Sequence, residues 1–227
     1  MDETTEHRRD ADATGRPQFF NPSAEVARLH GANLPHWRQG GATYYVTFRL
    51  ADSLPAQVLD AWRTARAELL AHAQADDEAA ERRLRALFAE RIEQHLDAGA
   101  GECLLARPGC ARIVGEALRH FDGQRYRLWV WCVMPNHVHA LVEPLAGHAL
   151  PDILHSWKSY TAHAINALLG REGPVWQAES FDHLVRSANA FEAQHDYILA
   201  NPERAGLADW AWRGTAVAQP VASASRR

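Results

Sequence analysis

Two histidines near the middle of the chain have a spacing suited to metal binding. His137 and His139 stand two residues apart in the segment HVHALVE, which is rich in apolar and β-branched residues. Successive side chains of a strand point to opposite faces, so both imidazoles project from one face. Such a pair can chelate a divalent metal, although histidine pairs on sheet faces also occur without one. A third ligand would have to come from another part of the chain.

The segment DYILANP offers both a nucleophile and a third ligand. Tyr197 and Asn201 lie four residues apart, which places them on one face of a helix, and Asn201 carries a carboxamide oxygen that can bind a metal. An enzyme that cleaves a phosphodiester has to neutralise the phosphate and aim a nucleophile at it. The metal would do the first and Tyr197 the second. Taken alone, DYILANP is better explained by a partly buried tyrosine and a helix terminator, and only the combination with the histidine pair favours the chemistry.

Attack by a tyrosine requires the loss of its proton, because the ordinary pKa of the phenol is near 10. His183 and Asp196 are the candidate bases, and each is also explained as a solvated or structural group. Tyr160, in SWKSYTAHA, is the rival nucleophile, but its place on the apolar side of an amphipathic helix predicts core packing. We therefore favour Tyr197, which has a candidate metal ligand four residues further on.

Hydrophobic periodicity and turn signals predict the elements that position these residues. Pro135-Asn136 interrupts two strand-like segments, which predicts a hairpin, and Asn201-Pro202 should end the last helix because the residue before proline avoids the helical region. Without the helical excursion at 56–100, the order is strand, helix, strand, strand, helix, strand and one extra helix. This order predicts an α+β, ferredoxin-like antiparallel sheet (βαββαβ) with a C-terminal catalytic helix and a helical insertion. The predicted strands are 43–50, 125–134, 137–143 and 179–186, and the predicted core helices are 113–121, 153–168 and 187–200.

Composition along the chain suggests three parts. Residues 1–35 are polar without sustained periodicity and are expected to be a flexible arm, with order beginning near Trp37. Residues 36–207 form the expected domain, with the insertion at about 56–100, and 208–227 form a tail. Trp129 and Trp131 stand two apart on a predicted strand, so they should share one face and pack in the core.

Three segments together resemble the REP-associated tyrosine transposases of the single-tyrosine HUH superfamily. They are WCVMPNHVHALVEP, VWQAESFDHLVRS and DYILANPERAGL, and the resemblance in order and spacing covers roughly 37–207. It implies metal-dependent cleavage and rejoining of single-stranded hairpin or repeat DNA through a covalent 5′-phosphotyrosine with a free 3′-hydroxyl. The implied cofactor is Mg²⁺ or Mn²⁺.

The resemblance assigns roles to individual residues. His137 and His139 match the metal ligands, Asn201 matches the third ligand on the helix, and Tyr197 matches the nucleophile. The insertion at 56–100 is longer than this family's core leads us to expect, and we place it outside the chemistry. Trp176 follows Gly173-Pro174 and is the candidate for stacking on a base. The expected DNA contacts are Trp176, Gln177, His183, Arg186 and Arg204.

The charge balance bears on DNA as a partner. The chain has 24 basic and 28 acidic residues, and 1–35 with 56–100 account for five net negative charges, so the remainder sums to about +1. A nearly neutral catalytic region fits local contacts with a strand better than long-range attraction of a duplex. The sequence has no signal-like or membrane-length apolar segment, so we expect a cytoplasmic, nucleoid-associated protein. Whether the protein forms a homodimer is left open. The three cysteines are expected to be reduced thiols.

Other function classes remain as alternatives. A catalytically retired protein that binds DNA repeats would keep the fold but lose the chemistry, against which the intact His137, His139, Tyr197 and Asn201 argue. A histidine-triad hydrolase would need histidine where Leu141 stands. An RNA-binding ferredoxin-like module would place aromatic side chains on its central strands and would need no metal pair.

Overall fold

The computed structural model describes residues 15–30, 35–71, 83, 86–87, 92–207 and 209–215 of the chain. Residues 92–97 are helical, within the insertion. The named elements are β1 (Ala27–His30), β2 (Pro35–Arg38), β3 (Tyr44–Arg49), α1 (Ala56–Ala71), η1 (Leu104–Ala106), α3 (Pro108–His120), β4 (Tyr126–Val133), β5 (His137–Pro144), α4 (Leu150–Leu169), β6 (Phe181–Leu184), α5 (Ala188–Arg204) and β7 (Arg213–Thr215).

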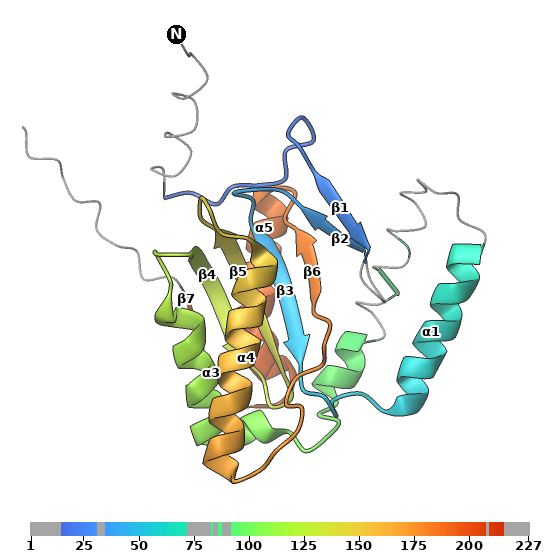
Figure 1. Ribbon diagram of the computed structural model, residues 1–227, viewed down its shortest axis with the longest axis vertical. Helices are drawn as coiled ribbons and strands as arrows, with labels where there is room; N and C mark the ends of the chain where they lie inside the picture. Colours follow the sequence, from blue (N-terminus) through green and yellow to red (C-terminus); the bar gives the residue numbers. More distant parts are fainter. Residues whose placement is uncertain are drawn as a thin grey trace, which may run out of the picture.

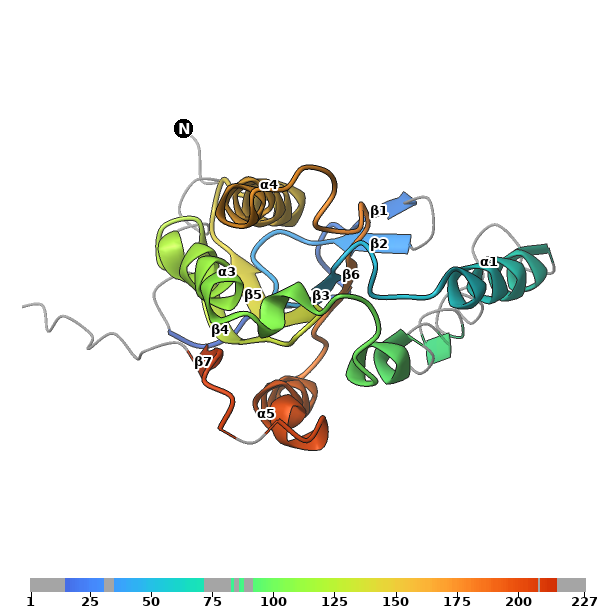
Figure 2. The same cartoon turned by 90° about the horizontal axis from the view of Figure 1, so that it is seen from below.

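A five-stranded sheet forms the centre of the domain, in the order β6-β3-β5-β4-β7. Each neighbouring pair is antiparallel. Helices α3 and α4 cover one face and α5 covers the other (Figures 1 and 2). The first four strands of this order, with α3 and α4 on one face, have the ferredoxin-like arrangement, to which β7 adds an edge. The α+β fold predicted from the sequence is confirmed.

The sheet separates two hydrophobic cores, because successive side chains on each strand alternate between its faces. On β3, Tyr44, Val46 and Phe48 belong to the core under α3 and α4. Tyr45 belongs instead to the core under α5, together with Ile198 from that helix. On β5 the apolar Val138 faces α3 and α4. The neighbouring His137 and His139 therefore face α5.

A β-bulge changes the faces predicted for two tryptophans on β4. The register shifts between Leu128 and Val130, so one residue is inserted into the alternation. Trp131 therefore packs in the core under α3 and α4, whereas Trp129 packs against the core under α5. The prediction that the two rings share a face is wrong, because strict alternation along β4 is interrupted at the bulge.

Part of the predicted arm contacts the domain around Phe20, so the described structure begins before Trp37. The Phe20 N–H donates to the Val185 carbonyl at 2.8 Å, and the Arg186 guanidinium lies 4.7 Å from the Phe20 ring centroid. Strand β1 pairs with β2 in a separate two-stranded sheet. The polar composition concealed these few apolar anchors. The remaining parts of the predicted arm and tail, 1–14, 208 and 216–227, lie outside the described residues.

Helix α5 begins where the sequence predicts and ends later than predicted. The Ser187 hydroxyl accepts a hydrogen bond from the Ala190 N–H at 3.2 Å and caps the helix. The helix continues through Pro202 to Arg204. Proline removes only its own donor, and the Ala205 N–H still donates to the Asn201 carbonyl at 3.0 Å. Asn201 is therefore held within the helix.

The insertion is helical in its described parts, α1 and 92–97, whereas 72–82, 84–85 and 88–91 lie outside the described residues. Buried Leu54, Ile92 and Leu96 form a small apolar cluster of their own. Trp62 of α1 is buried in the core under α5. The insertion is thus attached to the face of the sheet that carries the histidines.

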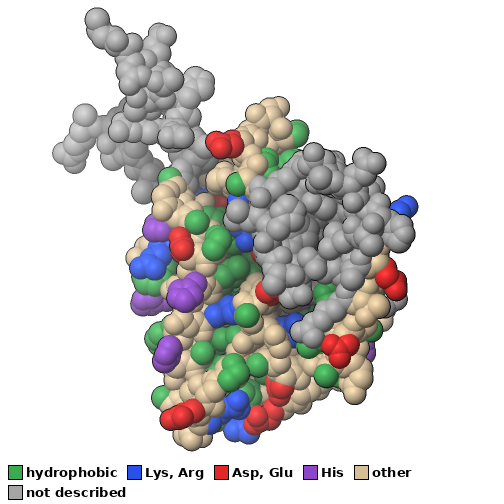
Figure 3. Space-filling model, turned by 45° about the vertical axis from the view of Figure 1, so that its right-hand side comes forward, with side chains coloured by type: hydrophobic (Ala, Val, Ile, Leu, Met, Phe, Trp, Pro, Cys, Tyr) green, Lys and Arg blue, Asp and Glu red, His purple; other side chains and the backbone are tan. Residues whose placement is uncertain are grey.

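The surface carries charges of both signs. On the described part of the face in Figure 3, lysine and arginine side chains alternate with acidic and apolar ones, and do not form one continuous basic area. This agrees with the near-neutral charge that the sequence gives to the region outside its two acidic segments. In the described ranges, none of the helices is sufficiently long and apolar to cross a bilayer.

We expect Phe20→Ala to lower the free energy of unfolding by roughly 1–2 kcal/mol, because a half-buried ring loses apolar contacts on the domain. Urea unfolding followed by circular dichroism measures the change. Arg16→Ala, at an exposed position of the same segment, is the control and should stay within about 0.5 kcal/mol of the wild type. An unchanged stability of Phe20→Ala would show that this segment is not anchored.

Candidate active site

The two histidines of β5 meet at their outer ring nitrogens. His137 Nε2 lies 2.9 Å from His139 Nε2, and the ring planes are at 82° to each other. Both side chains are closed to solvent, at 1% and 0% exposure. Two neutral imidazoles in this arrangement repel unless a proton or a cation lies between the nitrogens. The spacing of two residues therefore produces the chelating geometry that the sequence suggested.

A neighbouring amide decides which nitrogen of His137 carries the proton. The Asn136 amide group donates to the Ala100 carbonyl at 2.9 Å, which turns its oxygen toward His137 Nδ1 at 2.7 Å. Because an amide oxygen only accepts, Nδ1 of His137 must be the protonated nitrogen. The lone pair of His137 is consequently on Nε2, the atom that faces His139.

Hydroxyl groups on β3 decide in the same way which ring nitrogen of His139 carries the proton. Its Nδ1 lies 2.9 Å from the Tyr45 hydroxyl and 2.8 Å from the Thr47 hydroxyl. The Tyr45 hydroxyl donates to the Glu93 carboxylate at 3.3 Å, so its oxygen is left to accept from His139. Both histidines are then protonated at Nδ1 and present a lone pair at Nε2, as metal-binding histidines do.

Helix α5 brings the predicted nucleophile and third ligand to this pair. The Tyr197 ring centroid is 5.7 Å from that of His139, at an interplanar angle of 78°. Asn201, one turn further on, has its amide nitrogen 3.4 Å from His139 Nε2. Asn201 is buried, and its amide oxygen has no hydrogen-bond partner within the described part of the chain. The four-residue spacing thus places both side chains beside the histidines.

These residues fit a divalent metal. No three histidine, cysteine or carboxylate side chains in the described ranges are grouped to hold one, so the third donor has to be of another kind. The unpaired, buried oxygen of Asn201 is such a donor, since a buried acceptor without a partner is costly. Two imidazole nitrogens and one amide oxygen form a set that accepts Mn²⁺ or Mg²⁺.

A pair of carboxylates from the insertion borders Tyr197. The negative charges of Glu93 and Asp97 both act on the Tyr197 side chain. The Arg204 guanidinium lies over the Tyr197 ring, 4.8 Å from its centroid. Arg204 thereby supplies the positive charge opposite both acids. Residues 92–97 of the insertion therefore pack against the face that carries the site, where Glu93 accepts a hydrogen bond from the Tyr45 hydroxyl.

Burial controls protonation in this site. It lowers the pKa of His139 to about 3, and burial together with the neighbouring His139 lowers that of His137 well below its ordinary value. Burial, followed by the negative charges of Glu93 and Asp97, raises the pKa of Tyr197, against the effect of Arg204. At neutral pH both histidines are neutral and the tyrosine keeps its proton.

The predicted DNA contacts do not gather on one surface. Trp176 is only 7% exposed, and its ring N–H donates to the Thr161 hydroxyl at 2.9 Å. It packs edge-on against Phe48 under α4. The prediction that Trp176 offers an open stacking face is therefore wrong in this structure, because the ring fills the core on the face opposite the histidines.

Of the other predicted DNA contacts, some make contacts within the fold and some lie beside the histidines. Gln177 donates from its side chain to the Ala51 carbonyl at 2.5 Å and fastens the end of β3. Arg186 is exposed beside Phe20. His183 stacks on Tyr45 with ring centroids 5.0 Å apart, on the histidine side of the sheet. Of this set, His183 and Arg204 lie next to the site.

Tyr160 lies far from the histidines. It is 62% exposed and lines a cavity between α3 and α4, on the opposite face of the sheet. The prediction that it packs in the core is wrong, because the cavity leaves its ring uncovered. Its location also removes it as a rival to Tyr197 for a nucleophile beside the histidine pair.

Three partners of the site escaped the sequence analysis. Asn136 directly precedes His137, and its place in the predicted turn could have indicated a contact with that ring. Tyr45 and Thr47 alternate on β3, and their facing of His139 depends on the register of β3 against β5. That register pairs Thr47 with His139 and is not readable from either segment alone.

No family model matches the sequence, and no curated protein does. Among solved structures, the fold is similar to a REP-associated tyrosine transposase bound to a REP hairpin, with 16% identity, a TM-score of 0.45 and coverage of 83% of this chain and 93% of that one. A candidate transposase of Deinococcus radiodurans has 14% identity and a TM-score of 0.32, with coverage of 80% and 97%. Both descriptions name transposases, as the sequence resemblance does. The identities are too low to transfer residue roles.

The buried histidines should make stability depend on pH. An unfolded histidine has a pKa near 6.5, so below that pH the unfolded chain binds protons that His137 and His139 cannot bind when folded. Stability is fully present above pH ~6.5 and is lost as the pH falls toward 3, by up to about 1.4 kcal/mol per pH unit for each histidine. Urea unfolding in EDTA at several pH values between 5 and 7.5 measures this loss.

The variant His139→Asn should show a shallower loss of stability with falling pH than the wild type, since one buried imidazole is removed. His163→Asn, an identical change at an exposed position on α4, is the matched control. Equal pH dependence of the wild type and His139→Asn would contradict the burial of a neutral His139.

Proposed function

We propose that this chain is a metal-dependent enzyme that cleaves and rejoins single-stranded DNA through a covalent phosphotyrosine on Tyr197, as HUH transposases do. The observation that carries the proposal is the convergence of His137 Nε2 and His139 Nε2 at 2.9 Å, next to Tyr197 and Asn201 from one helix. Neither a nucleophile nor a chelating pair alone would support it. Their combination in one site does.

His137, His139 and Asn201 are the residues that would hold the metal. Bound there, a divalent ion supplies Lewis-acid stabilisation to a nonbridging oxygen of the scissile phosphate. Imidazole nitrogen suits Mn²⁺, whereas Mg²⁺ prefers oxygen ligands, so Mn²⁺ is the better chemical match. The hydrogen bonds at both Nδ1 atoms keep the rings turned to the correct side.

Tyr197 would attack the phosphorus and form the covalent link. Its side chain is partly exposed whereas the histidines are closed to solvent, so a strand can approach along the tyrosine. The phosphotyrosine keeps the energy of the cleaved bond, and a second DNA end can reverse the step without ATP. Arg204, over the phenol ring, holds a positive charge where the anionic strand would lie.

The proposed substrate is single-stranded DNA that forms a hairpin. The solved transposase named above is bound to a REP hairpin, and that partner is proposed for this chain as well. The charge outside the acidic segments is close to neutral, which suits a short local contact with a strand.

We expect wild-type protein mixed with labelled hairpin DNAs and Mn²⁺ to give a DNA-linked protein on denaturing gels. Tyr197→Phe should give no adduct, because the attacking oxygen is removed while the ring stays. Tyr160→Phe is the matched control, with the same change on the opposite face of the sheet, and should form the adduct at the wild-type rate. Chelation by EDTA should also abolish it.

Two results would count against this function. An adduct that persists in Tyr197→Phe would place the nucleophile elsewhere. Tight binding of hairpins without an adduct in any condition would favour the catalytically retired DNA-binding protein.

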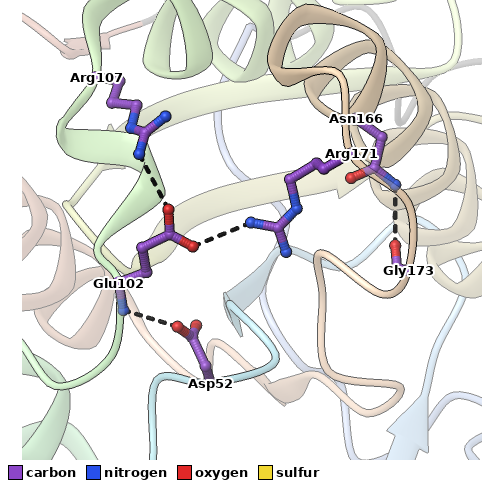
Figure 4. A network of polar contacts seen from close by, with 6 residues as sticks. All are labelled: Asp52, Glu102, Arg107, Asn166, Arg171 and Gly173. Carbon is purple, nitrogen blue, oxygen red and sulfur yellow. Dashed lines mark hydrogen bonds and ion pairs between the residues drawn. The ribbon is translucent and has the colours of Figure 1, made fainter.

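Replacement of Asn136 should weaken metal binding although it is not a ligand. We expect Asn136→Ala to lower the affinity for Mn²⁺ by about 10–100-fold, because His137 loses the partner that fixes its protonated nitrogen. Isothermal titration calorimetry measures the dissociation constant. Asn166→Ala, the same change at a remote loop contact, is the control (Figure 4). Equal affinity for Mn²⁺ in Asn136→Ala and the wild type would refute the role of Asn136.

A further inference from the structure

An arginine lies beside the histidine pair on the neighbouring strand. Arg49 is the last residue of β3, and the register of β3 against β5 places it opposite His137. Residues opposite each other in an antiparallel pair have Cβ atoms about 4.5–5.5 Å apart on the same face of the sheet. The side chain of Arg49 therefore leaves the sheet next to that of His137.

The hydroxyl contacts on β3 agree with this placement. Tyr45 and Thr47 both reach His139 Nδ1, from the face of the sheet that α5 covers. Side chains two residues apart on a strand share a face, so Arg49 follows Thr47 on the same side. One face of β3 thus presents two hydroxyl groups to His139 and a guanidinium group beside His137.

Hydrogen bonds fix the backbone of Arg49 relative to the turn that orients His137. The Gln177 N–H donates to the Arg49 carbonyl at 3.0 Å, and the Leu50 N–H donates to the Asn136 carbonyl at 2.9 Å. Asn136 is the residue whose amide oxygen faces His137 Nδ1. The point from which Arg49 extends is therefore fixed to the same turn that orients His137.

The loop after β3 directs a hydroxyl oxygen toward Arg49. The Glu102 N–H donates to the Asp52 carboxylate at 2.7 Å and fastens this loop (Figure 4). Ser53 is closed to solvent, and its hydroxyl donates to the Leu50 carbonyl at 2.8 Å, so its oxygen is left to accept. Arg49 Nη1 donates to that oxygen at 3.4 Å. This long hydrogen bond uses one of the five N–H donors of the guanidinium.

No acidic side chain in the described part of the chain forms an ion pair with Arg49. The ion pairs there use Arg38, Arg107, Arg112, Arg127, Arg171 and Arg213. Burial lowers the pKa of Arg49 to about 10, against the effect of Glu179, so the group stays charged at neutral pH. A cation withdrawn from water without a counter-ion is costly, and an anion that lies against it offsets the cost.

A second cation adds positive charge at this end of β3. The Lys158 ammonium, from α4, donates to the Ala178 carbonyl at 2.7 Å, in the segment that leads to β6. Burial, followed by the charge of Arg49, lowers the pKa of Lys158 to about 8, whereas Glu179 raises it. The two cations are thus close enough to repel, and the charge of one carboxylate acts on both. Such a place favours the approach of an anion.

We infer that Arg49 is a catalytic residue of the proposed reaction, whose guanidinium donates to a nonbridging oxygen of the phosphate that Tyr197 attacks. The inference rests on the proposed function and names the side chain that would hold the scissile phosphate. Arg49 is half-buried, so part of it remains open to an incoming strand, whereas the histidines are closed to solvent.

The guanidinium group suits this task. It is planar, and two of its N–H groups can donate to two phosphate oxygens at once. The charge on the nonbridging oxygens has to be neutralised while the phenol attacks, and a donor that is already in place does so without reorganisation. Arg204 lies over the Tyr197 ring and so serves the nucleophile. Arg49, beside His137, serves the phosphate.

The first measurement compares arginine changes on the two faces of the sheet. Single-turnover formation of the covalent adduct on labelled hairpin DNA with Mn²⁺ is followed for the wild type, Arg49→Ala, Arg49→Lys and Arg112→Ala. Loss of a donor to the phosphate should slow Arg49→Ala by about 10²–10³-fold. Arg49→Lys keeps the charge without the planar fork and should be slowed less. Arg112→Ala, at an exposed position of α3, is the control and should keep the wild-type rate.

The second measurement asks whether Arg49 contacts the scissile phosphate itself. The length of the released strand gives the cleavage position, and a hairpin with an uncharged methylphosphonate at that position is compared with the normal hairpin by fluorescence anisotropy. Tyr197→Phe, which cannot cleave, is used in EDTA. It should bind the methylphosphonate hairpin about 10–100-fold more weakly, because a hydrogen bond from a charged donor is lost. With Arg49→Ala added, the two hairpins should bind equally, and with Arg49→Lys the difference should return in part.

Two results would overturn the inference and leave the proposed function in place. One is a wild-type adduct rate in Arg49→Ala. The other is a methylphosphonate effect of the same size with and without Arg49, since a purely structural arginine would leave that effect unchanged. A wild type that forms no adduct on any hairpin would remove both the inference and the proposed function.

Discussion

The site depends on two imidazole lone pairs that point at each other inside a closed part of the protein. Neutral rings in this position repel, and burial prevents water from relieving the repulsion or a proton from entering easily. The arrangement persists because each Nδ1 is held by a partner, Asn136 for His137 and the hydroxyls of β3 for His139. A cation between the two Nε2 atoms, which are 2.9 Å apart, would remove the repulsion.

The sheet and α5 supply the second half of this arrangement. Helix α5 crosses the face that carries the histidines, and the four-residue spacing of Tyr197 and Asn201 brings a phenol and an amide to them on one helix face. The helix continues through Pro202, so Asn201 is positioned by regular backbone and not by a frayed end. That continuity keeps the buried amide group of Asn201 beside His139.

The insertion changes the character of the site. A minimal ferredoxin-like domain has its helices on one face of the sheet and would leave this face uncovered. Here α5, Trp62 and 92–97 pack on this face, and Glu93 accepts a hydrogen bond from the Tyr45 hydroxyl. The charges of Glu93 and Asp97 thus lie near Arg204, whose guanidinium is over the Tyr197 ring.

The sequence by itself determined the features that follow from the side-chain periodicity of a single strand or helix. Alternation on a strand placed His137 and His139 on one face, helical spacing placed Tyr197 and Asn201 together, and the order of elements predicted the ferredoxin-like sheet. Where a local period was broken the predictions were wrong, as at the bulge of β4, which separates Trp129 from Trp131, and at Pro202, which does not end α5.

Only the tertiary structure decided which elements meet. The burial of Trp176, the exposure of Tyr160 and the contact of Glu93 with Tyr45 result from packing between segments far apart in the chain. No period within one segment contains that information, because the distance between two elements is set by the side chains of both and by the register of the strands that carry them. The chemistry-bearing pairs could be found from the sequence, whereas their hydrogen-bond partners could not.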